Sequence, residues 1–282
     1  MKIFTVVKIK YFLLPILIWF QTSISFSQDK SHIVSLYSGV SKYIERDDAM
    51  SPFKYRGFSI PIEISYRYIG AKCRQTFYAN FDKLRLQSSL PDYENAGLNH
   101  YVQNTNIQIG YSYLHRVFRL VKYETDLYLG GEINSLINLR QHAYIHNNEF
   151  LMMDQFNSLG LKAQLEKRFA SNKRVVSASL NIPFISYVLM GNTYNAYVGE
   201  KIDPLMNYSG NMLFYLAKKG DFVSLDKLVY FKTDISFIQF ISSHIGVELK
   251  YSLRYYKFTQ YQNINYSKNL QNQFLIGIIG KL

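Results

Sequence analysis

The sequence predicts an all-β protein, a closed antiparallel transmembrane β-barrel of about ten strands, with twelve strands as the alternative. Three observations predict this fold class. Polar and apolar residues alternate with a period of two along most of the chain. The alternating segments run for roughly 12–15 residues, more than the about 9–11 that a tilted strand needs to cross a bilayer. No long apolar run follows residue 30, so no membrane-spanning helix is expected there.

Composition excludes several other classes of protein. The chain has 282 residues, of which 16% are aromatic and 18% are charged. So large an aromatic content excludes an intrinsically disordered chain, a collagen and a coiled-coil fibre. Cys73 is the one cysteine, which excludes an intramolecular disulfide and a zinc site built on paired thiolates.

Residues 1–27 have the features of a cleaved secretory signal peptide. Three lysines accompany the apolar run at 11–20, and small residues at Ser25 and Ser27 suit a signal peptidase. The run is too short for a transmembrane helix, although an uncleaved anchor is the alternative. We therefore expect an exported barrel domain at 28–282, with no nucleic-acid partner. Loss of three lysines lowers the formal charge from +12 to +9, and this excess favours contact with anionic lipid head groups.

The strands follow from the alternation, which is clearest from Phe58 to Tyr68. Every second residue there is apolar or aromatic, and the residues between include Glu63 and Arg67. Successive side chains of a strand point to opposite faces, so one face of this segment is apolar and the other polar. The same pattern predicts ten strands, at 31–43, 56–69, 71–85, 101–114, 121–136, 155–169, 173–187, 228–241, 244–258 and 269–282.

The connections between these segments predict how the barrel is oriented. Short joints, expected on the periplasmic side, lie near 69–72, 115–120, 170–173 and 241–244. Longer polar stretches, expected as outer loops, lie at 44–56, 86–100, 138–154, 189–227 and 259–268. In the longest loop, residues 212–217 predict a short helix over the outer mouth; one more hairpin, giving twelve strands, is the alternative.

A secreted all-β domain is the alternative to a membrane barrel. The length of the strands favours the membrane barrel, because strands of soluble sandwiches run for about five or six residues. Tyrosines also gather at strand ends, as in Tyr66-Tyr68, Tyr111-Tyr113 and Tyr255-Tyr256. There they would form the aromatic girdles at the two boundaries between lipid and water.

The chain resembles the small outer-membrane β-barrel proteins of Bacteroidota. The resemblance lies in a signal that ends in a small residue before Gln28, in tyrosine-rich amphipathic strands with short turns, and in the last strand at 274–282. It implies a place in the outer membrane of a Gram-negative cell envelope. It also implies contact with outer-membrane lipid, lipopolysaccharide and the barrel-assembly machinery, and a surface or periplasmic protein as a further partner. The family includes porin-like, adhesion and secretion-accessory members.

If the apolar faces meet lipid, the polar residues between them point into the lumen. Six acids and five bases are expected there and nearly balance: Glu63, Glu124, Asp126, Glu132, Glu166 and Glu248, with Arg67, Lys122, Lys162, Lys250 and Arg254. Charges inside a narrow barrel are costly unless they are paired. We therefore expect a lumen largely filled by paired charges, and a narrow polar conduit is the alternative.

Patterns that would carry catalysis are few, and no catalytic, cofactor-binding or metal-binding residue is assigned. His142 and His146 stand four residues apart with Glu149 following, but a solvated loop explains them as well as a metal site. His100, Asp92, Glu94, Ser88 and Ser89 supply residue types of a hydrolase, at no distinctive spacing. Cys73 is expected to be a small packing residue.

We accordingly expect a non-enzymatic barrel whose loops bind a surface partner or whose periplasmic face serves an envelope or secretion accessory role. A narrow solute channel is the first alternative, and a membrane-embedded hydrolase is the second. Aromatic residues suited to protein or glycan contact are expected in the loops: Tyr43, Phe53, Tyr55, Tyr93, Tyr144, Tyr194, Tyr197, Tyr208 and Tyr261.

Overall fold

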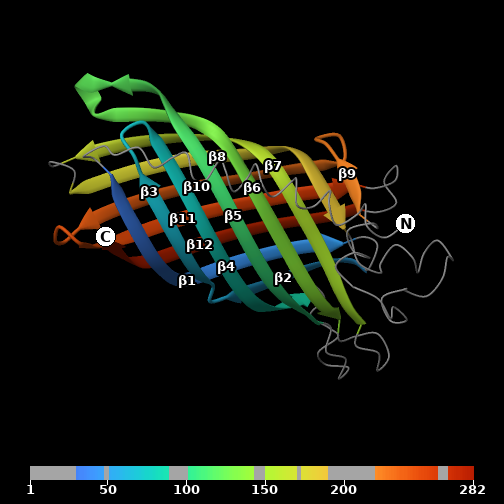
Figure 1. The fold of residues 1–282 in the computed structure, drawn as a ribbon. Coiled ribbons are helices and arrows are strands. Elements are labelled where there is room, and N and C mark those ends of the chain that lie inside the picture. Colours follow the sequence, from blue (N-terminus) through green and yellow to red (C-terminus); the bar gives the residue numbers. More distant parts are fainter. Residues whose placement is uncertain are drawn as a thin grey trace, which may run out of the picture.

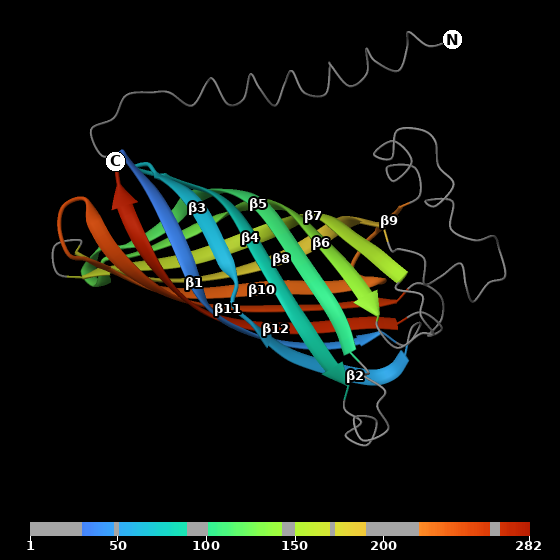
Figure 2. The ribbon, with the colours of Figure 1, turned by 90° about the horizontal axis from the view of Figure 1, so that it is seen from below.

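The alternating segments form β-strands that close into a barrel, as predicted (Figures 1 and 2). The computed structural model describes residues 30–47, 51–88, 101–142, 150–169, 173–189, 220–259 and 266–282. In chain order the strands are β1 (Ser31–Asp47), β2 (Ser51–Ser59), β3 (Ile62–Ile69), β4 (Cys73–Ser88), β5 (Tyr101–Leu120), β6 (Thr125–His142), β7 (Phe150–Phe169), β8 (Arg174–Leu189), β9 (Asp221–Val223), β10 (Leu228–Phe240), β11 (Ile245–Thr259) and β12 (Tyr266–Lys281).

The twelve strands occupy ten positions around the barrel. β2 and β3 follow one another between the same two neighbours, β1 and β4. The two strands are separated at Ile60 and Pro61, because a proline has no N–H to donate to a neighbouring strand. The three-residue β9 and the long β10 likewise pair with successive parts of β8. Pairing of β1 with β12 closes the ring, so the predicted barrel of about ten strands is confirmed.

Two of the predicted segments fall on residues outside the described ranges. They are the signal peptide at 1–27 and the short helix at 212–217. Among the residues that are described, no helix is long and apolar enough to cross a membrane.

Several strands extend further than predicted toward the outer loops. β1 and β2 leave residues 48–50 between them, where the sequence predicts a loop at 44–56. β6 extends to His142 and β7 begins at Phe150, within the predicted loop at 138–154. Those loop boundaries were wrong because the sheet continues with polar residues facing outward, and polar composition alone resembles a loop.

The turn between β5 and β6 also differs from the prediction of a joint at 115–120. Pairing of the two strands continues through a β-bulge between Arg116 and Phe118 as far as Leu120. The chain then reverses in the 3-10 helix η2 (Val121–Tyr123), which ends at Glu124 in a left-handed conformation with φ 47°. The resulting hairpin projects past the neighbouring turns, in green at the upper left of Figure 1.

The barrel has two different ends. The end that carries the β3–β4, β5–β6 and β10–β11 turns and the carboxyl terminus is called the short-turn end here. The opposite end, where β4, β6 and β8 finish, is the long-loop end. In a single-chain outer-membrane barrel the short turns face the periplasm.

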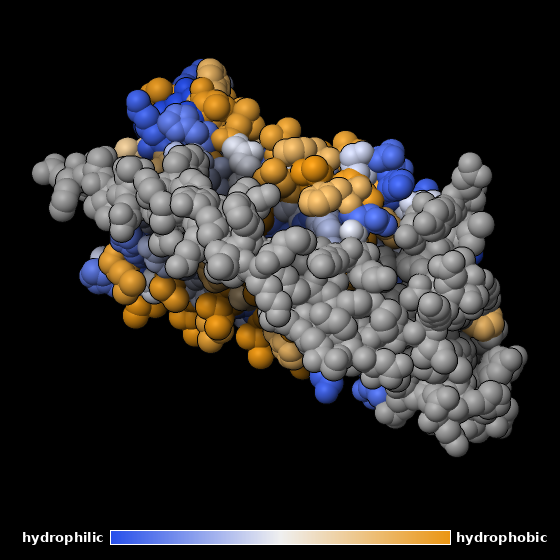
Figure 3. All heavy atoms as spheres, turned by 45° about the vertical axis from the view of Figure 1, so that its right-hand side comes forward, coloured by the Kyte–Doolittle hydropathy of each residue, from blue (hydrophilic) through white to orange (hydrophobic). Residues whose placement is uncertain are grey.

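Toward the short-turn end the wall is apolar outside and polar inside. Exposed side chains include Ile64, Leu161 and Ile276, which are 55%, 66% and 62% exposed. Figure 3 shows such apolar residues over the middle of the visible wall. The residues between them, such as Glu63 and Glu132, are buried in the lumen. This arrangement is typical of a wall that faces lipid, and the exposed apolar residues are called the apolar belt.

Toward the long-loop end the arrangement is reversed, with polar residues outside and apolar residues inside. Leu84 and Leu86 of β4 are buried in the lumen, whereas Lys83 and Arg85 are exposed. Buried apolar residues fill this end of the lumen in two clusters: Leu136, Phe156, Val188, Val223, Leu228, Tyr230, Tyr256 and Phe258, and Tyr43, Tyr55, Leu84, Leu86 and Val102. The expectation that apolar residues point outward and polar residues point into the lumen is therefore wrong at this end. An outer face that meets water favours polar residues outside and apolar residues inside.

Candidate functional site

The lumen contains a cavity of about 590 Å³ that opens at the short-turn end. Ten of its lining residues are Lys or Arg and four are Asp or Glu. This cavity is called the basic cup. Its floor, in the lumen, and its mouth, at the short-turn end, are described in turn below. Its volume is large enough to receive a small ligand or part of a larger one.

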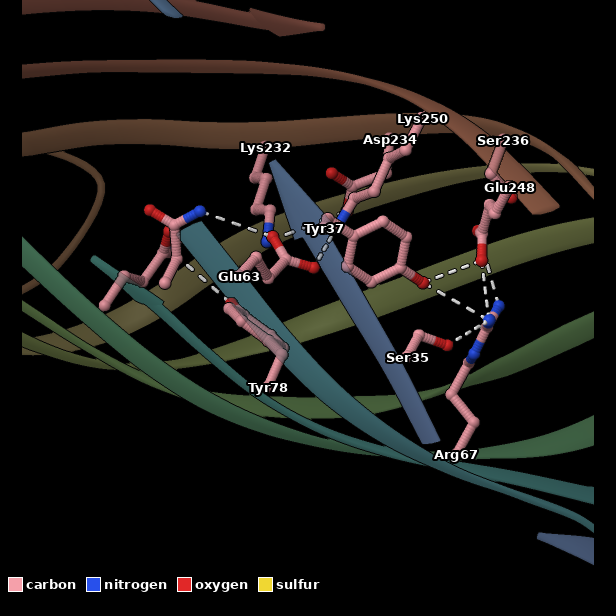
Figure 4. Close-up of polar contacts among 12 residues, drawn as sticks. Ser35, Tyr37, Glu63, Arg67, Tyr78, Lys232, Asp234, Ser236, Glu248 and Lys250 are labelled. Carbon is pink, nitrogen blue, oxygen red and sulfur yellow. Dashed lines mark hydrogen bonds and ion pairs between the residues drawn. The ribbon is translucent and has the colours of Figure 1, made fainter. Parts of the chain in front are cut away.

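Two tyrosines and two lysines form much of the floor of the basic cup (Figure 4). The Lys232 ammonium lies 3.9 Å from the centre of the Tyr78 ring, and the Lys250 ammonium lies 5.7 Å from the centre of the Tyr37 ring. Lys250 is also ion-paired with Glu63 at 2.7 Å. Contacts of cations with ring faces and carboxylates stabilise charges that are removed from water.

Glycines on neighbouring strands make room for both tyrosine rings. A Cβ atom added at Gly277 would lie 2.2 Å from the Tyr37 ring, and one added at Gly110 would lie 2.5 Å from the Tyr78 ring. A glycine inside a strand often marks a close approach of this kind. The floor therefore depends on strand glycines as well as on charged residues.

One side of the cup is held by a hydrogen-bonded group around Glu248. The Arg67 guanidinium donates to this carboxylate at 2.6 Å, and the Tyr37 hydroxyl donates to it at 2.7 Å. Arg67 also donates to the Ser35 hydroxyl at 3.0 Å. Figure 4 shows the side chains of Tyr37, Arg67 and Glu248 converging from β1, β3 and β11, respectively. Such multiple bonding fixes each group in one orientation.

Four arginines surround the mouth of the cup and share two carboxylates. Arg74 and Arg168 both donate to Glu166, at 3.0 and 2.7 Å. Arg116 and Arg119, from the projecting β5–β6 hairpin, each lie 3.7 Å from Asp126.

The mouth of the cup therefore carries an excess of positive charge. Guanidinium groups present several donors in a plane, which suits carboxylate and phosphate groups. The excess makes the cup a candidate site for an anion.

The lumen is closed between the floor of the cup and the long-loop end. Arg254 donates to Gln108 at 3.1 Å, and Gln271 donates to Asp82 at 2.9 Å. All four side chains belong to residues that are at most 5% exposed. A water-filled passage would leave the side chains along it accessible, so the described residues leave no open passage at this level.

A second polar group lies closer to the long-loop end. Arg140, 1% exposed, is ion-paired with Glu45 at 2.9 Å and with Asp154 at 2.5 Å. Asn104 donates a further hydrogen bond to Glu45 at 3.1 Å. These residues, called the Arg140 triad for its three charged members, lie among the apolar side chains of the two clusters and add to the closure.

Most of the charged residues predicted for the lumen are found there. Five of the acids and four of the bases face inward: Glu63, Asp126, Glu132, Glu166 and Glu248, with Arg67, Lys162, Lys250 and Arg254. Lys122 and Glu124 were wrongly placed, because they lie exposed in the turn of the β5–β6 hairpin. The predicted pairing also occurs, for example between Lys162 and Glu132 at 2.7 Å.

Sequence reasoning missed the members of the Arg140 triad, because all three fall in stretches that were predicted to be loops. It also placed Tyr43 and Tyr55 in loops and Tyr256 in an aromatic girdle, whereas all three are buried in the lumen. The signal that could have found them is the lysine next to each tyrosine in the sequence, which occupies the opposite face of the strand: Lys42, Lys54 and Lys257.

The residues considered for catalysis or metal binding are mostly outside the described set. This holds for the side chains of His142, His146 and Glu149, and for His100, Asp92, Glu94 and Ser89. Ser88 is half-buried at the end of β4, and Cys73 is a partly buried free thiol at its start. Within the described residues, no group of three or more His, Cys, Asp or Glu side chains could hold a metal ion.

Comparisons with known proteins bear on the fold. Neither a protein-family model nor a curated protein matches the chain. Among solved structures it is similar to the outer membrane protease OmpT from Escherichia coli, with 9% sequence identity, a TM-score of 0.53, and 92% of this chain and 99% of that chain covered.

Two further structures are more distant. The translocator domain of the autotransporter NalP from Neisseria meningitidis has 7% identity and a TM-score of 0.39, with 98% and 97% of the chains covered. Neisserial surface protein A has 10% identity and a TM-score of 0.35, with 90% and 100% covered. At such identities the likeness to OmpT shows a shared barrel fold.

Proposed function

We propose that the protein is a non-enzymatic, non-conducting barrel of the outer membrane that serves an envelope or secretion accessory role. In this proposal the basic cup faces the periplasm and binds an acidic segment of a soluble partner. The observation that carries the proposal is a lumen open at one end as a basic cavity and closed beyond it by buried polar and apolar side chains. Such a lumen suits binding better than passage.

The apolar belt supports the membrane location. Ile278 and Phe274 on β12 and Ile62 on β3 are at least 50% exposed, and a soluble barrel would bury such residues. Outer-membrane lipid, lipopolysaccharide and the barrel-assembly machinery are the partners that this location requires. The outer loops with their aromatic residues, which could serve a surface partner, lie largely outside the described residues.

Conductance measurements test the closed lumen. The full mature chain, reconstituted in planar bilayers, should show no steady single-channel current, whereas a general porin prepared in the same way should conduct. A reproducible open state on the nanosiemens scale would refute the proposal and support the alternative of a narrow solute channel.

Binding of an acidic peptide tests the role of the cup. A fluorescent peptide rich in Asp and Glu should bind the protein in detergent, and the double variant Arg116→Gln/Arg119→Gln should weaken binding by about tenfold. The matched control is Lys72→Gln/Lys122→Gln, which removes two exposed charges at the same end outside the cup lining. Equal weakening by both variants would mean that only net charge matters, and would refute a site in the cup.

The non-enzymatic assignment has its own test, because the OmpT fold also carries a protease. His32, His115 and His244, the histidines whose side chains are described, all lie at the short-turn end, and His32 is bonded to Tyr66 at 2.6 Å. Incubation with peptide and phospholipid substrates should give no turnover. Cleavage that survives purification of the protein would support the membrane-embedded hydrolase instead.

A further inference from the structure

Four basic residues form a row across the outer surface of the barrel toward the long-loop end. Lys257 of β11 pairs with Lys268 of β12, Lys268 with Arg46 of β1, and Arg46 with Lys54 of β2. Neighbouring strands lie about 4.8 Å apart, so the row is roughly 15 Å long. Alternation sends the chain neighbours of these residues into the lumen, where they are buried: Tyr256, Ser267, Glu45 and Tyr55.

Further cations continue this surface toward the apolar belt. Arg56 and Lys42 are exposed on the tiers below the row. Lys42 is two residues, or about 7 Å, from Val40, where the belt begins on β1 with a side chain that is 53% exposed. Phe274 pairs with Val40 across β1 and β12. The basic surface and the apolar belt are therefore continuous on one side of the wall.

The row places cations opposite one another on neighbouring strands. Like charges directly opposite one another on neighbouring strands destabilise a sheet. A ligand with several anionic groups would lessen the repulsion between such neighbouring cations.

We propose that this surface, called the basic tier and comprising Lys42, Arg46, Lys54, Arg56, Lys257 and Lys268, binds the phosphate groups of a phosphorylated lipid in the outer leaflet. Its acyl chains lie on the apolar belt beside Val40 and Phe274. Phosphate suits the site because ammonium and guanidinium groups both bind it, arginine through several donors at once. The proposal rests on the membrane location proposed above and adds a defined lipid site to it.

Lipid retention in a bilayer tests the basic tier. The full mature chain is placed in nanodiscs of phosphatidylcholine that contain a small fraction of diphosphorylated lipid A, and the lipid A that co-purifies after detergent extraction is measured by native mass spectrometry. The variant Lys42→Gln/Lys54→Gln/Lys268→Gln should bind lipid A roughly 100-fold more weakly, since each lysine near a charged lipid surface contributes a factor of about five.

The control variant is Lys72→Gln/Lys122→Gln/Lys173→Gln, which removes three exposed lysines at the short-turn end. It should retain lipid A as the wild type does, and lipid A without phosphates should bind neither form. Equal retention by the wild type and the basic-tier variant would overturn the proposal, as would an equal loss in both variants.

A second readout separates lipid from free phosphate, and membrane location from lipid binding. Lipid A should raise the thermal unfolding temperature of the wild type and not that of the basic-tier variant; an equal rise with inorganic phosphate alone would overturn a lipid site. A wild-type chain that fails to enter nanodiscs would refute the membrane location itself. Entry without retention of lipid A would refute only the basic tier.

Discussion

Removal of the guanidinium from the Arg140 triad should destabilise the barrel strongly. Arg140 is 1% exposed and pairs with Glu45 and Asp154, which are 3% and 0% exposed. Arg140→Met would leave two buried carboxylates without this cation. Two charge-assisted contacts at about 1.5–3 kcal/mol each give a loss of about 3–6 kcal/mol. That range agrees with the about 3–5 kcal/mol expected when one partner of a buried ion pair is removed.

Urea unfolding of the refolded barrel in detergent, followed by circular dichroism, measures this loss as a lower midpoint at an unchanged slope. The informative control is the triple variant Glu45→Gln/Arg140→Met/Asp154→Asn, which removes all three charges at similar volume. It should recover most of the lost stability, because no carboxylate is left buried without a cation. Wild-type stability of the single variant, or a triple variant as unstable as the single one, would refute this reasoning.

The remaining predictions concern the cup and the projecting hairpin. Gly110→Ala should lower the free energy of unfolding by about 1–3 kcal/mol, because its Cβ would lie 2.5 Å from the Tyr78 ring; Gly131→Ala, whose Cβ would meet one carbonyl oxygen at 3.5 Å, should cost less than about 1 kcal/mol in the same urea titration. Val121→Ser/Tyr123→Ser should change stability by less than about 0.5 kcal/mol, because both side chains are more than half exposed in the hairpin turn. A large loss of stability in Gly131→Ala or in Val121→Ser/Tyr123→Ser would contradict the described packing.

The strands of the half that carries the apolar belt could be predicted because one physical rule accounts for the alternation there. Lipid outside and a polar lumen inside require strict alternation, as in the segment from Phe58 to Tyr68. Tight turns such as Gly70–Lys72 between β3 and β4 interrupt that alternation briefly and so mark the strand ends. Closure of the sheet follows from the same rule, since lipid offers no partner to an unpaired edge.

The half toward the long-loop end could not be assigned in the same way, because period-two alternation does not say which face is inside. At residues 83–87 the basic residues are outside and the leucines are inside, the reverse of the arrangement around Glu63. The identity of the polar residues carries the missing information. Lys83 and Arg85 alternate with leucines that could fill a core. No acid lies on the same face of residues 83–87 as these two cations, so that face lacks the opposite charges expected of a lumen with paired charges.

The distribution of charge shows most plainly what the register of the strands adds to the information in the sequence. The predicted excess of positive charge is spread along the chain, and no short segment reveals a site. In the structure the deep lumen is close to neutral, because Lys250 and Lys162 each have a carboxylate partner at 2.7 Å. Strand pairing also brings other basic residues of the described chain together, at the cup mouth and in the basic tier. Lys54 and Lys257 are 203 positions apart in sequence yet stand in one row of four strands. Since only closure of β12 on β1 creates that row, its anion-binding capacity should appear with the folded barrel and be absent from the urea-unfolded chain.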